Sequence, residues 1–475
     1  MAAVSCPRFF AVGALLVALA AAPALGQTRG SWNVDADGLW SAGSNWLNNT
    51  IAGGVSGTAT FANNITATRT VTLDSNRSLG AFIFGDADTA SAASWIVSGS
   101  TMTMNNGTNS ALLTVNALGT GATATISTVL AASGTTPSVI KNGVGTLVLG
   151  GVNTFTTKLE ITEGTLQVSA DRNLGAAGTF ATDRIVISNG ATLRTSAGFT
   201  MNAARGITVG SGGGTISANG GVLTIAAPLA GSGNTASVTG ASAVILQNTS
   251  GTATNVNWDF AANAGVRAFF EGANALGTGD VRVRNAIRLT SQSMTTGTLT
   301  NAVTLDDGAG ITARSSGGAQ TYTNVTLPST GTLVFNQDDQ TTAALRITSG
   351  KELTGDLTIN TSQGGSNAVG DVTLSGIFSG ASGAIIKSGT GASGRLILTG
   401  ANTYGGNTTI NTGTLQLGNG STAGSLSTSS VITGSAGGTL AFNRSDTITS
   451  GVDFNSAIVG GINIAQVGSG TLVLT

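Results

Sequence analysis

Short runs of alternating apolar and polar residues fill almost the whole chain after residue 26. The runs are four to six residues long and close with Gly, Asn, Asp or Ser, while helical periodicity is scarcely visible. Alternation places apolar side chains on one face of a β-strand, and the closing residues favour turns. The pattern predicts strands over 68–73, 81–84, 112–115, 146–149, 184–187, 281–284, 332–335, 356–359 and 395–398.

Two segments that lie far apart in the chain have nearly the same sequence. The first opens at Lys141 and the second at Lys387, and a third copy opens at Gln466 and reaches Thr475. Such self-similarity is typical of repeat proteins, whose units bury their apolar faces by stacking on neighbouring units. Because the third copy stops inside a unit, we expect the natural chain to continue beyond Thr475.

The tripeptide Gly-Thr-Leu marks the period of the repeat. It occurs seven times, and successive copies at Gly145 and Gly164 lie 19 residues apart, whereas those at Gly413 and Gly438 lie 25 apart. Gly suits a corner with positive φ, Thr the outward side of a strand and Leu the inward side. This spacing predicts an all-β fold, a right-handed parallel β-helix. An antiparallel sandwich is the rival fold, and it would place two-residue Asn-Gly loops at regular positions.

The two ends of the sequence differ from the rest. Residues 1–26 are predicted to be a secretory signal peptide, with Arg8 before an apolar stretch and a cleavage site at 24–26. An uncleaved anchor is the alternative, but the apolar run is short for a bilayer. Residues 27–56 hold Trp32, Trp40 and Trp46, which we expect to cap the open end of the solenoid; a sugar-stacking platform is the alternative. The solenoid should then span 57–475, with repeats at 141–168, 387–417 and 466–475.

Composition supports a folded, exported chain of low charge. Gly is frequent at 71 residues and Pro rare at 5, which alone would allow disorder, but the hydrophobic fraction of 40% lies in alternating runs. Charged residues make up 9% and the net charge is −1, so there is no basic patch for nucleic acid. The single cysteine, Cys6, precedes the apolar stretch of the signal peptide, so the mature chain has no disulfide.

Little in the sequence points to catalysis. The chain has no histidine, which removes Ser-His-Asp triads and the usual zinc and haem sites. Carboxylate chemistry remains, but the acidic pairs sit among turn residues, where Asp is common for backbone reasons. Lys141 and Lys387 recur with the repeat, so we expect each to be a solvated corner or an edge-guarding charge. No catalytic, cofactor-binding or metal site is therefore predicted. The acidic pairs are Asp35 and Asp37, Asp86 and Asp88, Asp306 and Asp307, and Asp338 and Asp339.

The repeated pattern resembles the autotransporter-associated β-strand repeat. It is Gly-x-Gly-Thr-Leu-x-Leu, then Gly-x-Asn-Thr-Tyr/Phe, then Ile-x-x-Gly-Thr-Leu, and it covers 143–168, 389–417 and the stump 468–474. The resemblance implies a β-helical passenger region that is exported and displayed at, or released from, the surface of a Gram-negative cell. It implies no catalytic activity. Whether a membrane barrel or a sorting tail follows Thr475 stays open.

Three functions remain in view. The leading hypothesis is a non-enzymatic, adhesin-like surface or secreted protein that contacts extracellular glycans or neighbouring cells through many weak contacts. The second is a β-helical carbohydrate-active enzyme, a polysaccharide lyase or hydrolase, which would need three or more charged side chains converging from neighbouring coils. The third is a passive spacer with smooth faces.

Overall fold

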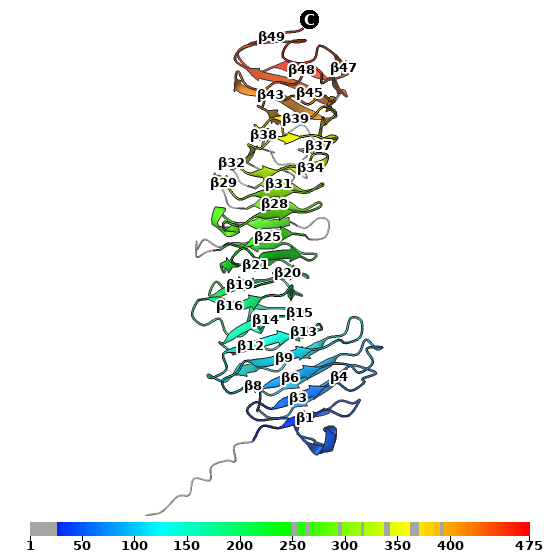
Figure 1. Cartoon of the computed structure of the whole chain (residues 1–475), viewed down its shortest axis with the longest axis vertical. Helices are drawn as coiled ribbons and strands as arrows, with labels where there is room; N and C mark the ends of the chain where they lie inside the picture. Colours follow the sequence, from blue (N-terminus) through cyan, green and yellow to red (C-terminus); the bar gives the residue numbers. More distant parts are fainter. Residues whose placement is uncertain are drawn as a thin grey trace, which may run out of the picture.

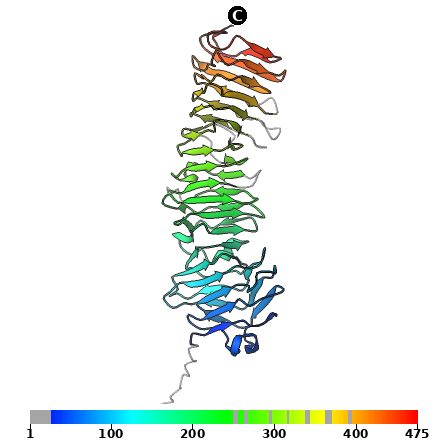
Figure 2. The ribbon, with the colours of Figure 1, turned by 45° about the vertical axis from the view of Figure 1, so that its right-hand side comes forward.

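The computed structural model describes residues 26–248, 255–261, 267–292, 297–314, 318–336, 343–361, 370–389 and 394–475. The predicted signal peptide therefore lies outside the described residues, apart from Gly26. The chain forms an elongated rod in which strands stack along the long axis, from the N-terminal end to the C-terminal end (Figures 1 and 2). Strand pairs are parallel, and a strand inside a sheet bonds to strands of the coil before and the coil after, as β13 does with β10 and β15.

Two sheets start at the N-terminal end. The first has nine strands in the order β1 (Arg29–Ser31), β3 (Thr58–Phe61), β6 (Ala81–Phe84), β9 (Ala111–Val115), β12 (Ser138–Asn142), β14 (Lys158–Ile161), β16 (Ala181–Ile187), β19 (Arg205–Val209) and β22 (Leu229–Ala230). The second has thirteen, in the order β2 (Gly38–Leu39), β4 (Arg69–Leu73), β7 (Trp95–Gly99), β10 (Ala124–Ile126), β13 (Thr146–Leu149), β15 (Thr165–Val168), β17 (Thr192–Thr195), β20 (Gly214–Ala218), β23 (Thr235–Thr239), β25 (Asn257–Phe260), β27 (Val281–Val283), β30 (Val303–Leu305) and β33 (Val325–Thr326).

Two further long sheets carry the stack to the C-terminal end. The twelve-stranded sheet has the order β18 (Phe199–Met201), β21 (Leu223–Ile225), β24 (Val244–Leu246), β26 (Arg267–Phe270), β28 (Arg288–Ser291), β31 (Gly310–Ala313), β34 (Gly331–Phe335), β37 (Asp356–Asn360), β40 (Ala384–Ser388), β42 (Thr408–Ile410), β44 (Ile432–Gly434) and β47 (Ile458–Gly460). The eight-stranded sheet has the order β29 (Gly297–Leu299), β32 (Ala319–Tyr322), β35 (Ala344–Ile347), β38 (Val372–Leu374), β41 (Leu396–Leu398), β43 (Gly413–Ser421), β45 (Gly438–Arg444) and β48 (Asn463–Gln466).

Short elements complete the coils. Three small sheets pair β11 (Leu130–Ala132) with β8 (Met102–Met104) and β5 (Arg77–Leu79), β36 (Lys351–Glu352) with β39 (Phe378–Ser379), and β46 (Thr447–Thr449) with β49 (Thr471–Val473). The helical turns are of the 3-10 type, at η1 (Gly43–Asn45), η2 (Leu47–Asn49), η3 (Asp171–Leu174) and η4 (Ala273–Leu276). A coil such as β6, β7 and β8 gives one strand to each of three sheets, so the solenoid is three-sided.

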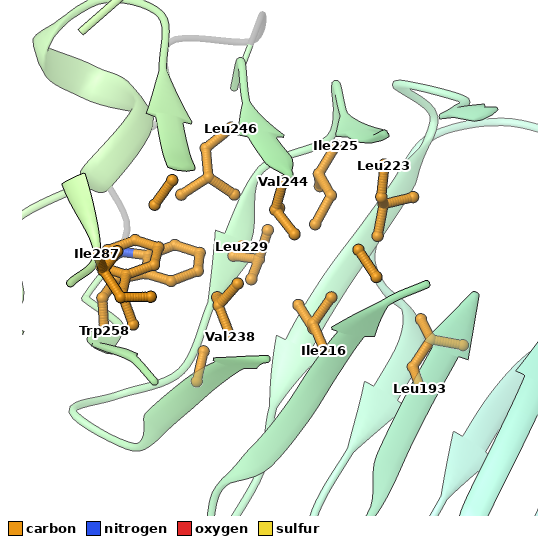
Figure 3. Packing of buried hydrophobic residues seen from close by; sticks show 14 of the residues in the cluster. Leu193, Ile216, Leu223, Ile225, Leu229, Val238, Val244, Leu246, Trp258 and Ile287 are labelled. Atoms are coloured by element: carbon orange, nitrogen blue, oxygen red, sulfur yellow. The ribbon is translucent and has the colours of Figure 1, made fainter. Parts of the chain in front are cut away.

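The predicted all-β parallel solenoid is confirmed, and the parallel pairing excludes the antiparallel sandwich. The nine predicted strands correspond to β4, β6, β9, β13, β16, β27, β34, β37 and β41. The register places Thr146 beside Thr165 and Thr414 beside Thr439, so successive Gly-Thr-Leu copies are successive coils of one face. Alternate side chains point inward and form one continuous core of Leu, Val, Ile and aromatic residues. Figure 3 shows Leu193, Ile216 and Val238 from three neighbouring coils lying in that core.

Large aromatic rings fill the N-terminal end of the core. Trp32, Trp40 and Trp46 are at most 2% exposed, with Trp40 and Trp46 ring centroids 4.9 Å apart. The rings also pack on Phe61, whose centroid lies 5.7 Å from that of Trp40. Strands β1 and β2 already pair with β3 and β4, so this segment is also the first coil. A sugar needs an exposed ring face for stacking, so the alternative of a sugar platform on these tryptophans is wrong.

Candidate functional sites in the repeat units and on the outer faces

The lysines that open the two repeat units point into the core. In β12 the inward positions are Val139 and Lys141, and Lys141 is stacked between Leu113 and Ile161 of the neighbouring coils. Lys387 is placed likewise between Ile359 and Ile410. Both side chains are buried, at 0% and 2% exposure. The expectation of a solvated corner or an edge charge is therefore wrong, because the strand alternation carries both lysines inward.

Each buried ammonium group binds carbonyl groups of the corner that follows its strand and of the matching corner in the next coil. Lys141 Nζ donates to the carbonyls of Asn142, Gly143 and Glu163 at 3.0, 2.6 and 2.8 Å. Lys387 Nζ donates to the carbonyls of Ser388 and Thr412 at 2.8 and 3.3 Å. Burial lowers the pKa of both lysines to about 8, although the charge of Glu163 works against this for Lys141. A lysine enclosed in this way fixes a corner and is shielded from any substrate.

The Asn-Thr-aromatic part of the repeat joins one coil to the previous coil. Asn153 Oδ1 accepts the backbone N–H of Leu130 at 2.9 Å, and Asn153 Nδ2 donates to the Asn173 carbonyl at 2.6 Å. Asn402 Oδ1 likewise accepts the N–H of Phe378 at 3.0 Å. Both Asn side chains are buried, at 3% and 2% exposure. The motif is thus a clamp on the backbone of the preceding coil, because buried N–H groups require an acceptor.

The glycines of Gly-Thr-Leu do not all serve the same purpose. Gly164 has φ of 64°, as expected for a corner. Gly145 and Gly438 lack a positive φ, but a Cβ atom there would lie 2.5 Å from the carbonyl oxygen of Asn116 or Ile410. At these two positions the expectation of positive φ is wrong, and glycine is needed because the preceding coil approaches too closely for a side chain.

The acidic pair in the first coil holds that coil to the next. Asp35 accepts a hydrogen bond from Arg69 Nε at 2.6 Å and from the Thr66 hydroxyl at 2.7 Å. These contacts, with Arg69 first, lower the pKa of Asp35 to about 2. Asp37 Oδ1 accepts the N–H of Thr70 at 2.7 Å. Both carboxylates therefore accept hydrogen bonds from groups of the chain itself.

The remaining acidic pairs also have structural partners. Asp88 accepts from Asn64 Nδ2 at 2.8 Å, and Asp86 is 8% exposed beside Ser91, whose hydroxyl lies 3.5 Å from Asp86 Oδ2. Asp307 Oδ1 accepts the N–H of Thr332 at 2.6 Å. Asp338 and Asp339 lie outside the described residues. In the described part of the chain, no group of three or more His, Cys, Asp or Glu side chains is arranged to hold a metal ion.

Charged side chains from neighbouring coils do meet on the outer face of the thirteen-stranded sheet. Arg284 Nε lies 2.6 Å from Asp259 Oδ1, and Arg282 Nη2 lies 3.1 Å from Asp306 Oδ2. Asp259, Arg282 and Arg284 border a shallow hollow of about 240 Å³ that Asp280 also lines. The hydrogen bond to Asp259 raises the pKa of Arg284.

The inward lysines and the cluster around Asp259 were both absent from the sequence-based prediction, for different reasons. The Lys141 position could be recognised from alternation with Val139. The cluster around Asp259 needed the strand register, which places Asp259 beside Arg282 and Arg282 beside Thr304. Charges that lie more than twenty residues apart in the sequence can be recognised as neighbours only when the length of each coil is known.

The three-sided stack of parallel coils with recurring sequence units defines a repeat-built β-solenoid. Residues 139–168 and 385–417 match the Passenger-associated-transport-repeat family, and each match starts two residues before Lys141 or Lys387. The chain therefore carries two copies of this passenger-associated repeat, which confirms the resemblance that its sequence predicted.

One curated relative carries the name of an adhesin. Over 88 residues the chain is 44% identical to "Adhesin BmaC autotransporter" of Brucella suis biovar 1 (strain 1330). The aligned segment is 18% of this chain and spans only 2% of the adhesin. No solved structure gives a significant match. Within the described residues, no helix combines the length and the apolar character needed to cross a membrane.

Proposed function

We propose that this chain is a non-enzymatic, adhesin-like passenger region that is exported and presented at the cell surface or released from it. The observation that carries the proposal is the presence of two Passenger-associated-transport-repeats built into one continuous solenoid. The local similarity to an autotransporter adhesin supports the same function. The rod would present outward Thr, Ser and Asn side chains to extracellular glycans or to neighbouring cells, with many weak contacts acting together.

Surface exposure can be tested with an antibody raised against the purified chain. We expect the antibody to label intact cells of the source bacterium, and added protease to remove the labelled protein without lysis. A control antibody against a cytoplasmic protein should label only lysed cells. Labelling that appears only after lysis, together with no chain in the culture medium, would contradict export.

Adhesion can be tested with the purified chain on immobilised glycans and on whole cells. We expect binding that rises steeply when the chain is displayed in many copies on beads, because each single contact is weak. A chain that binds no glycan and no cell type in multivalent form would be a passive spacer, the third function considered above.

The enzyme alternative rests on the cluster of Asp259, Arg282, Arg284 and Asp306. It can be tested by incubating the chain with acidic and neutral polysaccharides and measuring new reducing ends and unsaturated products. We expect no turnover above that of the Asp259→Asn variant. Turnover that this substitution abolishes would favour the lyase or hydrolase and overturn the non-enzymatic assignment.

A further inference from the structure

A cleft opens on the third side of the solenoid, close to the N-terminal end. Its volume is about 640 Å³, within the range of small-ligand sites. The floor is formed by Ser78 of β5 and Thr103 of β8, which are register partners on adjacent coils. One wall is the loop 53–55 of the first coil, and the other is the corner 75–77. Three coils therefore contribute to a single concave surface.

The wall formed by the first coil is fixed in place. The N–H of Ser56 donates to the carbonyl of Asn105 at 2.9 Å, which ties this loop to β8's end. Gly80 packs so closely on the loop that a Cβ atom would lie 2.6 Å from Ser56 Cα. On the opposite wall, Asn76 Oδ1 accepts the N–H of Thr101 at 3.0 Å. A preformed site with walls held in this way loses little freedom when a ligand binds.

Arg77 is the charged residue that lines the cleft. Its guanidinium lies 3.7 Å from Asp74, whereas the other ion pairs described in this chain are 2.5 to 3.1 Å long. The Asp74 carboxylate accepts a hydrogen bond from the Ser41 hydroxyl. Arg77 Nε is buried and has no hydrogen-bond partner among the described residues, whereas the side chain as a whole is 21% exposed. The guanidinium is thus oriented by Asp74, and its terminal nitrogens are the donors left for another partner.

The remaining lining groups suit a hydroxyl-rich ligand. Ser75 and Thr103 offer hydroxyls, and Asn76 and Asn105 offer amides, while Val55 is 46% exposed and gives the loop an apolar surface. A guanidinium forms paired hydrogen bonds with a carboxylate, and hydroxyls and amides pair with hydroxyls. From this combination we propose that the cleft binds a uronate residue of an acidic polysaccharide, with its carboxylate on Arg77. The assignment deepens the proposed adhesive function and rests on it.

The test is a calorimetric titration of the full chain with D-glucuronate, D-glucose and short glucuronate oligomers. We expect glucuronate to bind with Kd on the order of 1 mM, oligomers at least as tightly, and glucose at least about tenfold more weakly. Arg77→Gln should weaken glucuronate binding at least about tenfold. The affinity of Arg77→Lys should lie between those of the parent and Arg77→Gln, because lysine keeps the charge and loses the paired geometry.

Two further variants separate the cleft from general effects of charge and folding. Arg346→Gln removes an exposed guanidinium from the eight-stranded sheet and should leave binding unchanged. Thr103→Trp fills the cleft from an outward strand position and should abolish binding while the melting temperature is retained. Equal binding of glucose and glucuronate, unchanged binding by Arg77→Gln, or no binding of the oligomers would each overturn the proposal. Antibody labelling of intact cells does not depend on Arg77, so failure of the cleft and failure of surface export give different results.

Discussion

Lys141 and Lys387 occupy the same inward position in two distant coils, and each donates to backbone carbonyls of the corner that follows its strand and of the matching corner in the next coil. A charged group in an apolar column lowers stability unless its hydrogen bonds are satisfied. The lysines therefore hold these corners in place from inside the core. The corners contain glycine, which has no side chain to pack. Their recurrence at the start of both family matches makes them part of the repeat's structure.

The first prediction concerns the pH dependence of stability. Burial lowers the pKa of both lysines to about 8 from an ordinary value of 10.5. Between these values the unfolded chain binds a proton at each lysine that the folded chain does not, so the free energy of unfolding rises with pH over this window. Denaturant midpoints measured from pH 8 to 10 should therefore increase, by up to about 1.4 kcal/mol per pH unit for each lysine.

The double variant Lys141→Met and Lys387→Met provides the control for this pH effect. It lacks both titrating groups, so the free energy of unfolding of the parent should rise relative to that of the variant as the pH rises from 8 to 10. Subtraction also removes the contributions of groups that the two proteins share, such as the buried tyrosines. A difference that stays constant over this range would mean that neither lysine has a lowered pKa.

The sequence predicted the architecture because its signals are local. Alternation defines the strands, and Gly-Thr-Leu spacing defines the coils at Thr146 and Thr165. The sequence gives no comparable signal for contacts between coils. Asp259 and Arg284 form an ion pair of 2.6 Å across 25 positions of chain, and the cleft at Arg77 is built from three coils. Coil length varies, so the register, and with it the outer surface, had to come from the structure.

The second prediction concerns the asparagine clamp. Asn153→Ala removes the acceptor of the Leu130 N–H and the donor to the Asn173 carbonyl, both in buried surroundings. Leaving two such groups unsatisfied should cost about 2–4 kcal/mol. Hydrogen exchange followed by mass spectrometry should show faster exchange in peptides that cover 124–132. Val152→Ala, at a neighbouring site that is 53% exposed, should change exchange very little.

The third prediction concerns the aromatic end of the core. Trp40 is fully buried, and its indole N–H donates to the Ala52 carbonyl at 3.0 Å. Trp40→Ala should destabilise the first coils by about 3–5 kcal/mol, because it removes a large ring from a packed cluster. Limited proteolysis should then cut the chain within the first hundred residues and leave the C-terminal coils intact. Leu39→Ala, at 50% exposure, is the matched substitution and should resist proteolysis as the parent does.

The last prediction concerns the glycine at the corner of the repeat. Gly164→Ala would place a Cβ atom 2.5 Å from the Gly143 carbonyl oxygen on a residue with φ of 64°. Both the clash and the left-handed backbone disfavour alanine, so we expect a loss of more than about 2 kcal/mol. Gly134 has a negative φ and open space around its Cβ position, so Gly134→Ala should be neutral or slightly stabilising. Chemical denaturation of both variants makes the comparison directly. If Gly164→Ala were as stable as Gly134→Ala, the corner between β14 and β15 would have to tolerate a side chain, and close contact between coils would not explain the glycine in this repeat.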